Sequence, residues 1–86
     1  MKLKYKFVIK PIGDQFSAST LNASDFNGVL FFSEVGKYIF EELEFGIEKE
    51  ELIEKLMRRY EGDAEEIKNE ADKFINILKE NQLLED

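Results

Sequence analysis

The sequence predicts a small α+β domain in which a three-stranded antiparallel sheet is followed by three helices, in a winged helix-turn-helix-like arrangement. Up to residue 32, apolar residues alternate with polar ones or form a short run, as they do in strands. Beyond that point they recur with the period of a helix. The 86 residues contain no internal repeat, low-complexity stretch or linker, so we expect a single domain over residues 1–86.

The first strand is expected over residues 2–10. Four apolar residues alternate there with lysines and a valine, namely Leu3, Tyr5, Phe7 and Ile9. This period of two is typical of a strand with one buried face. Pro11 cannot donate to a strand ladder, so we expect the strand to end there. A turn at residues 13–14 then reverses the chain into a second strand over residues 16–20.

The third strand is expected over residues 29–32, which are apolar on both faces. If Leu30 and Phe32 face the helices, then Val29 and Phe31 face the opposite side. A strand with one solvated face would carry polar residues there, so something is expected to cover these two side chains.

Three explanations for this second apolar face stay open. A foreign peptide covers it, or the loop at residues 21–26 packs over it through Leu21 and Phe26, or the chain dimerises through it. The sequence alone does not separate a binding surface from an internal contact here.

A first helix is expected from Ser33 to Gly46. Ser33 can accept a hydrogen bond from the free amides of the first turn, and glycine is suited to end a helix. Gly36 lacks a side chain and so allows another element to approach closely. The inner face of this helix is predicted to carry Val35, Ile39, Phe40 and Leu43.

Two further helices complete the predicted fold. The second covers residues 48–60 and has a poor N-terminal cap. The third begins at a capping box formed by Asp63 and Glu66, and Asn81 is expected to end it in the left-handed conformation. Its inner stripe is predicted to carry Ile67, Ala71, Phe74, Ile75 and Leu78. Residues 83–84 are expected to fold back on the core.

Composition excludes most familiar catalytic chemistry. The chain contains neither histidine nor cysteine, so its own side chains cannot build a zinc site, a disulfide, a cysteine nucleophile or a histidine-based triad. We expect no catalytic residue, no metal and no cofactor. The longest apolar run, residues 29–32, is far shorter than the roughly 20 residues that span a bilayer, and the N-terminus lacks a signal segment. We therefore expect a cytoplasmic protein without a membrane partner.

The charge distribution argues against nucleic acid as a partner. Twelve basic and 19 acidic residues give a net charge of −7, and the predicted third helix, residues 63–80, is acidic overall. Such a helix would be repelled by phosphates, which disfavours a DNA-binding winged helix. Four lysines precede the first acidic residue, namely Lys2, Lys4, Lys6 and Lys10. They either solvate and protect an edge strand or form an electrostatic docking patch.

One flank of the predicted third helix carries an apolar residue outside the inner stripe. At about 100° per residue, Ile77 lies about 100° from Leu78, on the same flank as Phe74 and Glu70. A shoulder position of this kind is common in amphipathic helices. It is also the position at which a peptide docked beside the helix would place a side chain.

A set of spaced positions extends over nearly the whole chain, from about Tyr5 to Asp86. It consists of Ser33 with Gly36, Ile39-Phe40, Gly46, Glu50-Glu51-Leu52-Ile53, Tyr60, Phe74-Ile75, Leu78, Leu83 and Leu84. This spacing resembles that of the PqqD-like family, which is named after the D protein of pyrroloquinoline quinone biosynthesis and whose members are precursor-peptide recognition elements of natural-product pathways.

The resemblance implies a peptide-binding chaperone without chemistry of its own. In the family, the leader segment of a ribosomally made precursor adds as a strand to the edge of the third strand, against the third helix. A partner enzyme, often a radical SAM protein, then modifies the precursor. Glu48 and Glu70-Ala71 depart from residues that are common in the family, which weakens one helix cap and leaves the peptide preference open.

The candidate site follows from the strand edge and the helix flank together. We expect Val29, Phe31, Phe32, Phe74 and Ile77 to contact a bound peptide, with Glu70 and Lys73 as polar contacts. The first alternative is a homodimeric scaffold for a partner enzyme. The second, which the charge disfavours, is a winged-helix DNA-binding protein.

Overall fold

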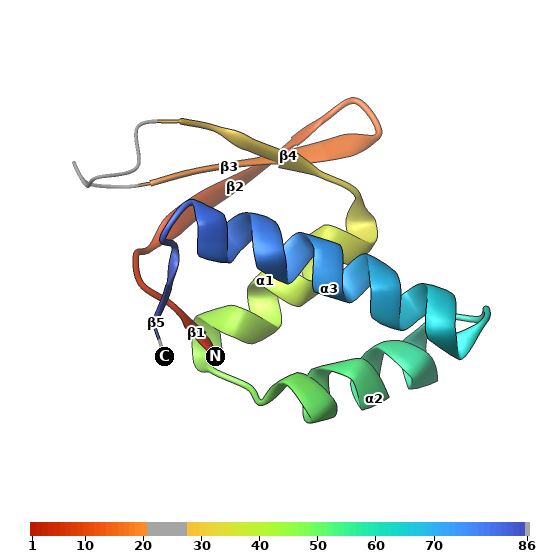
Figure 1. Cartoon of the computed structure of the whole chain (residues 1–86). Helices are drawn as coiled ribbons and strands as arrows, with labels where there is room; N and C mark the ends of the chain where they lie inside the picture. Colours follow the sequence, from red (N-terminus) through yellow and green to blue (C-terminus); the bar gives the residue numbers. More distant parts are fainter. Residues whose placement is uncertain (21–27, 86) are drawn as a thin grey trace.

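The computed structural model describes residues 1–20 and 28–85 of the chain. Figure 1 shows two layers, with a three-stranded sheet on one side and three helices on the other. The predicted α+β fold is confirmed. In chain order the elements are β1 (Lys2–Leu3), β2 (Phe7–Ile12), β3 (Gln15–Thr20), β4 (Leu30–Phe32), α1 (Glu34–Phe45), α2 (Lys49–Arg59), α3 (Ala64–Glu80) and β5 (Leu84–Glu85).

The larger sheet is antiparallel and has the order β2-β3-β4. Strands β2 and β3 form a hairpin around the turn at residues 13–14, as predicted. Strand β4 pairs with β3 so that Ala18 lies opposite Leu30 and Phe16 lies opposite Phe32. Because β3 is central, β2 and β4 are the two outer strands of this sheet.

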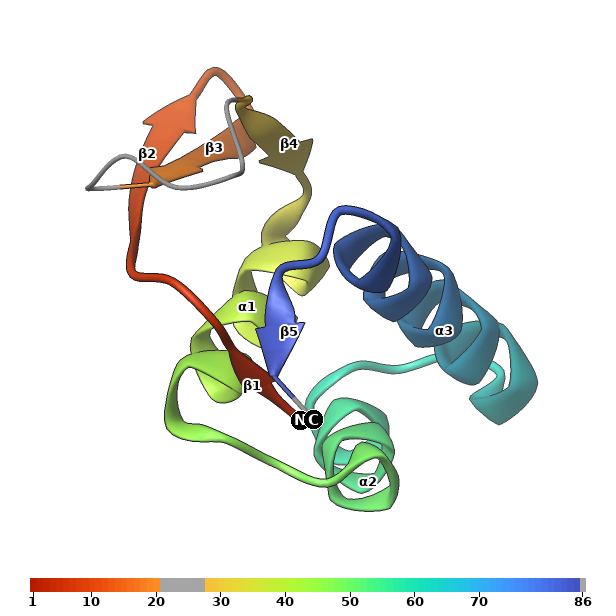
Figure 2. The ribbon, with the colours of Figure 1, turned by 60° about the vertical axis from the view of Figure 1, so that its left-hand side comes forward.

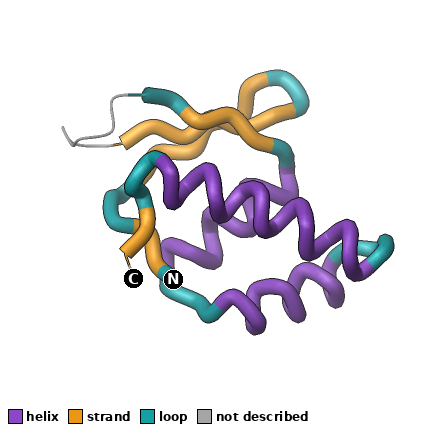
Figure 3. The backbone as a smooth tube through the Cα atoms, in the orientation of Figure 1, coloured by secondary structure: helices purple, strands orange, loops and turns teal. Residues whose placement is uncertain are grey.

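The predicted first strand is wrong, because it consists of two strands in different sheets. The chain leaves the β1 strand after Leu3 and enters β2 only at Phe7. Strand β1 pairs with the C-terminal strand β5, and the Lys4 amide extends this contact by donating to the carbonyl of Leu83 at 2.8 Å. Figure 3 shows these two short strands beside each other at the chain ends, apart from the larger sheet. A period-two pattern fixes the face of each side chain but not the sheet to which its strand belongs.

Pro11 does not end the strand as predicted, because it lies within β2, opposite Phe16. Strand β2 is an outer strand of the sheet. A residue without an N–H is tolerated in such a strand because one of its edges has no ladder to complete.

Helix α1 begins and ends as predicted. Ser33 is its N-cap and accepts a hydrogen bond from the Gly36 amide at 3.5 Å. The helix ends at Gly46, whose φ of 92° is accessible to glycine without strain. The predicted inner face is also observed, since Ile39, Phe40 and Leu43 are buried.

Helix α2 has a poor cap, as predicted, since the Glu48 side chain makes no capping hydrogen bond. Asp63 caps α3 by accepting from the Glu65 amide at 2.9 Å. Among the described residues, no reciprocal hydrogen bond from the Asp63 amide to the Glu66 carboxylate completes the predicted capping box.

The C-terminal end of α3 differs by one residue from the prediction. Asn81 has a φ of −92°, and the left-handed residue is Gln82, with a φ of 59°. The Leu83 amide then donates to the carbonyl of Leu78 at 2.9 Å, which is the bond of a Schellman motif. In this motif the left-handed residue follows the helix cap, so Asn81 is the cap itself. The motif turns Leu83 and Leu84 into the core, where both are buried.

Most of the buried core residues come from the three helices, and the larger sheet contributes Ala18 and Phe32. Where this sheet meets the helices, three phenylalanine rings pack together. Phe32 of β4 stacks on Phe40 of α1 with a centroid separation of 5.3 Å, and its edge meets Phe74 of α3 at 5.7 Å. Figure 2 shows β4 leading directly into α1, and α3 meets α1 through the rings of Phe74 and Phe40. The rings therefore fix the relative placement of β4 and α3. Within the described ranges, no helix has the length and apolar character needed to cross a membrane.

Candidate functional site

Strand β4 is the outer strand that leads into the helices. This strand pairs with β3 on one side, and on the other side it has no strand partner among residues 1–20 and 28–85. Alternate N–H and C=O groups of an outer strand point away from the sheet and are free to pair with another chain. Within these ranges, no further strand of the chain lies at the edge of β4 beside α3.

A groove of about 320 Å³ runs between this edge and α3. Its walls come from three segments of the chain: the end of β4 with the residue after it, the first two turns of α1, and the middle of α3. In that order the lining residues are Phe31, Phe32 and Ser33, then Val35, Gly36 and Ile39, then Glu70 and Phe74. We call this feature the strand groove.

Close packing of α1 against β4 forms the floor of the strand groove. A Cβ atom added to Gly36 would lie 2.7 Å from the Cβ of Phe32, closer than real Cβ contacts allow. The close approach predicted for Gly36 is therefore observed. It lets Phe32 lie directly on the start of α1, so that the floor is apolar and shallow beside the strand edge.

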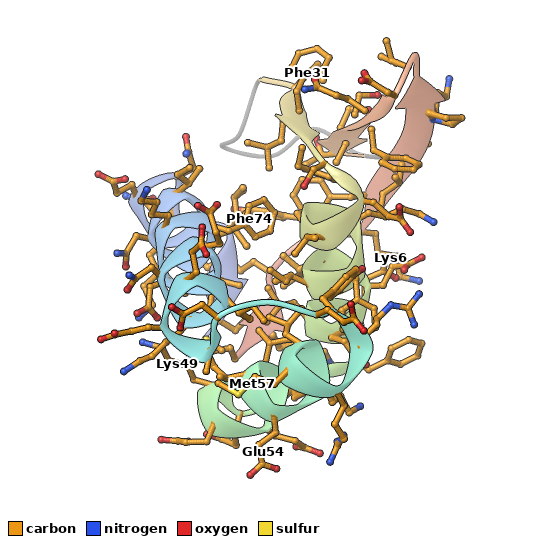
Figure 4. All side chains as sticks on the ribbon, turned by 90° about the vertical axis from the view of Figure 1, so that its right-hand side faces the viewer. Lys6, Phe31, Lys49, Glu54, Met57 and Phe74 are labelled. Carbon is orange, nitrogen blue, oxygen red and sulfur yellow. The ribbon has the colours of Figure 1, made fainter. Side chains whose placement is uncertain are left out.

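Phe74 joins the two walls of the strand groove. Its ring is half-buried and meets the rings of Phe32 and Phe40 edge-on, at 5.7 Å and 6.3 Å. In Figure 4 the Phe74 side chain projects from α3 into the space between α3 and α1. Because these ring contacts hold α3 at a set distance from β4, core packing determines the width of the groove.

Two of the predicted site residues, Val29 and Phe31, are exposed in or next to β4, and Phe31 also lines the strand groove. The exposed fractions are 61% for Phe31 and 52% for Val29, and Figure 4 shows Phe31 at the end of the molecule farthest from α2. The orientation predicted for β4 is thus confirmed, since its Phe32 is buried. The proposed cover by Leu21 and Phe26 falls outside the described residues.

The remaining predicted residues lie along one side of α3. Glu70 and Phe74 line the strand groove, whereas Lys73 and Ile77 are exposed nearby and do not line it. Ile77 has 45% of its surface exposed and lies one turn beyond Phe74, on the same side of the helix. Glu70 takes part in none of the ion pairs formed by the described residues, so its carboxylate is available to a ligand.

Sequence reasoning missed four residues of the strand groove. Ser33, Val35, Gly36 and Ile39 were assigned only to the cap, the inner face and the packing of the first helix. A signal for them exists in the sequence. A strand that leads directly into a helix through one capping residue must place the first turns of that helix beside its own last residues.

The site offers a backbone edge, an apolar groove and one free carboxylate. Unpaired N–H and C=O groups give register and affinity to an extended peptide, and the groove beside them accepts alternate side chains. This arrangement is suited to recognition of an extended chain.

Comparisons with known proteins give one family and one similar fold. Residues 21–84 match the family model for coenzyme PQQ synthesis protein D (PqqD). A search of curated proteins finds no match to the chain. A solved structure of "TbiB1 in Complex with the TbiA(beta) Leader Peptide" is similar to this fold, with a TM-score of 0.74 and 25% sequence identity over 99% of this chain and 95% of that one.

Proposed function

This chain belongs to the PqqD family, and from that premise we propose that it binds the leader segment of a ribosomally made precursor peptide by strand addition at β4. The precursor is then presented to a modifying enzyme, such as a radical SAM protein. The observation that carries the proposal is the free edge of β4, which borders the strand groove along α3. A solved structure similar in fold contains a leader peptide, which supports the same class of ligand.

An added strand would continue the antiparallel order of the sheet. Antiparallel pairing is slightly more stable per residue than parallel pairing, so the peptide is expected to run from the Phe32 end of β4 toward the Leu30 end. Successive side chains of a strand point to opposite faces. One set would enter the strand groove toward Phe74 and Glu70, and the other would lie beside Phe31 on the outer face.

A longer added strand would also contact the other predicted site residues, namely Ile77, Val29 and Lys73. In Figure 1, α3 runs in the opposite direction to β4, so its C-terminal half lies toward the same end of the molecule as the start of the strand. A peptide that passes Leu30 would therefore reach Ile77 with its groove-facing side chains and Val29 with its outer ones. Lys73, exposed between the two turns, is proposed as a polar contact.

Titration of leader peptides tests the proposal. Peptides encoded by short open reading frames next to the gene are titrated by calorimetry into the wild-type chain, Ile77→Glu and Met57→Glu. Ile77 and Met57 are matched because both are helical, with 45% and 41% of their surface exposed. Met57 lies on α2, which Figure 4 shows at the opposite end from Phe31.

A charge placed against the apolar part of the peptide is expected to weaken binding at least about tenfold, or about 1.4 kcal/mol, in Ile77→Glu. Met57→Glu is expected to bind like the wild type. If no neighbouring leader binds the folded wild-type chain, or if both variants lose affinity equally, the proposed site is wrong.

Backbone methylation separates strand addition from other modes of binding. Single N-methyl groups are moved along the bound peptide. In a strand, the N–H groups of alternate residues point to opposite edges, so every second position is expected to abolish binding while the positions between them tolerate the group. A uniform response along the peptide would contradict strand addition.

The same edge could instead pair two copies of this chain, as the scaffold alternative requires. Sedimentation with and without the bound leader separates these functions. A leader that occupies β4 is expected to leave a monomer, whereas a dimer that persists at saturating leader would place the dimer contact elsewhere.

A further inference from the structure

A second pocket, of about 330 Å³, opens where α2 turns into α3. Apolar residues from all three helices contribute to its lining, namely Val35 of α1, Leu56 at the core side of α2, Tyr60 after α2 and Ile67 of α3. We call this feature the α2–α3 pocket. It is separate from the phenylalanine cluster that supports the strand groove.

The α2–α3 pocket continues the strand groove. Val35 and Glu70 line both cavities. Along α3 the order is Ile77 and Phe74 beside the strand, then Glu70 at the shared wall, then Ile67 in the second pocket. A peptide that runs antiparallel to β4 starts at the Phe32 end, so the residues that precede its added strand would reach this second pocket.

The rim of the α2–α3 pocket carries only one sign of charge. Four acidic residues line it and no lysine or arginine does, the four being Glu61, Asp63, Glu66 and Glu70. Asp63 is used as the cap of α3, where it accepts the Glu65 amide. The other three take part in none of the ion pairs formed by the described residues.

We infer that the peptide segment that precedes the added strand carries a lysine or arginine whose side chain enters the α2–α3 pocket. This inference rests on the proposed function. The long apolar stem of such a side chain would lie against Ile67 and Val35, while its cationic group would reach the rim carboxylates of Glu66 and Glu70. Lysine and arginine bury their stems in this way while their charged ends stay hydrated.

Charge and shape together select this occupant. A purely apolar side chain would fill the floor but leave the rim carboxylates unpaired, and an acidic side chain would be repelled by them. The strand groove has a single carboxylate, Glu70, at its far wall. The pocket therefore adds a charge requirement at one end of a site that is otherwise read through backbone and apolar contacts.

Selection from a randomised peptide library tests the inference without a known ligand. The library is displayed and selected on the wild-type chain. Binders that lose affinity for Ile77→Glu are kept, and their sequences are aligned on the segment that contacts Ile77. We expect lysine or arginine to be enriched before the strand segment. A selected peptide is then made with this residue replaced by norleucine, which keeps an apolar stem but removes the charge.

The two peptides are titrated into the wild type, Glu66→Lys and Glu65→Lys. Both glutamates are exposed in the first turn of α3, but only Glu66 lines the pocket. Both substitutions change the net charge and the helix dipole interaction alike. Norleucine is expected to weaken binding about threefold to fivefold in the wild type and Glu65→Lys. In Glu66→Lys this difference is expected to vanish or to change sign.

Salt gives a second readout, since the preference is expected to disappear in about 1 M salt, where the Debye length is about 3 Å. Two outcomes would overturn this inference and leave the proposed function intact. One is a set of binders that are sensitive to Ile77→Glu but lack a basic residue. The other is a norleucine effect of equal size in Glu66→Lys and Glu65→Lys. A library that yields no binder, or only binders insensitive to Ile77→Glu, would overturn the proposed function itself.

Discussion

The two sheets differ in whether the outer edges of their strands are hydrogen-bonded to other parts of the chain. Strand β1 is paired with β5 on one side, and on the other side Met1 and Ile47 exchange two hydrogen bonds of 2.9 Å through their backbone groups, one of them from the amino group of Met1. Strand β4 is paired only with β3 among the described residues. The end of the molecule that contains β1 is thus closed by backbone hydrogen bonds on two sides, whereas β4 keeps an open edge beside α3.

This difference shows that the open edge is a local feature and not a consequence of small size. In this chain of 86 residues the two-residue strand β1 is paired with β5, and the residue before it is hydrogen-bonded to Ile47. At β4 the chain instead turns into α1 through the single residue Ser33, and the neighbouring α3 presents side chains but no backbone groups. We therefore expect substitutions at the closed end to change stability and substitutions at the open edge to change binding.

The largest effect on stability is expected at the closed end. Leu3→Ala removes a side chain that is 6% exposed and belongs to the core. Loss of buried apolar volume is expected to lower the free energy of unfolding by about 2–3 kcal/mol, measured by denaturant unfolding.

Peptide binding gives the contrasting measurement for Leu3→Ala. The folded fraction is expected to bind the same peptide within about twofold of the wild type, because Leu3 does not line the strand groove. Lys2→Ala, one residue away and exposed, is expected to change stability by less than about 0.5 kcal/mol. A large loss of affinity in Leu3→Ala would mean that the two ends are coupled.

The closed end is also the part of the fold that the sequence did not predict. Leu3, Tyr5, Phe7 and Ile9 alternate without a break, and no residue among them marks the passage from one sheet to the other. The partner of β1 is β5, at the other end of the chain. Local patterns record burial and turns, but they carry no information on which distant strand will complete a ladder.

Helix ends were predictable because their signals are local. The Ser33 and Asp63 caps and the stop at Gly46 each depend on hydrogen bonds or backbone angles within a few residues. Gln82 is the exception, since its left-handed conformation belongs to a residue type that does not favour it. There, burial of Leu83 and Leu84 decides the conformation, and this is a tertiary effect.

An intermediate effect on the free energy of unfolding is expected for Gly36→Ala, at the point where β4 packs on α1. Helix propensity alone predicts that Gly36→Ala stabilises α1 by about 1 kcal/mol. The new Cβ would instead lie 2.7 Å from the Cβ of Phe32, which moves only with the β4 backbone. Overpacking of this kind costs about 1–3 kcal/mol, so we expect a net loss of about 1 kcal/mol in unfolding experiments.

Gly36→Ala is also expected to weaken peptide binding, because displacement of β4 alters the strand groove. Glu44→Ala, at an exposed position of the same helix, is expected to behave like the wild type in both measurements. Stabilisation of the chain by Gly36→Ala would show that β4 yields easily, and the groove would then not be preformed.

Prediction of the candidate site had the same limit as prediction of the fold. The flank of α3 that carries Glu70, Phe74 and Ile77 could be identified from helical periodicity. The first turn of α1 could not be identified as a groove wall, because this depends on how far Phe32 sinks onto Gly36. That distance is set by the packing of three rings from three elements.

The smallest effect is expected on the side of α3 that faces away from the open edge. There Lys49 of α2 and Asp72 of α3 form an ion pair at 2.7 Å. The hydrogen bond from the Lys49 ammonium and its charge lower the pKa of Asp72. A lowered pKa in the folded state stabilises the fold above the ordinary aspartate value, about 3.9, and this contribution is lost as the pH falls through the lowered value. Asp72→Asn is therefore expected to destabilise the chain slightly at neutral pH, by less than either substitution above.

The pH profile distinguishes this ion pair from a packing effect. Unfolding is followed by denaturant titration at neutral pH and below pH 4, and the difference between the wild type and Asp72→Asn is expected to shrink toward the acidic end. Affinity for a leader peptide should stay unchanged at neutral pH, because neither Lys49 nor Asp72 lines the strand groove or the α2–α3 pocket. If Asp72→Asn weakened binding, the position of α3 would depend on α2 as well as on the ring cluster, and the open edge would no longer be independent of the rest of the helical layer.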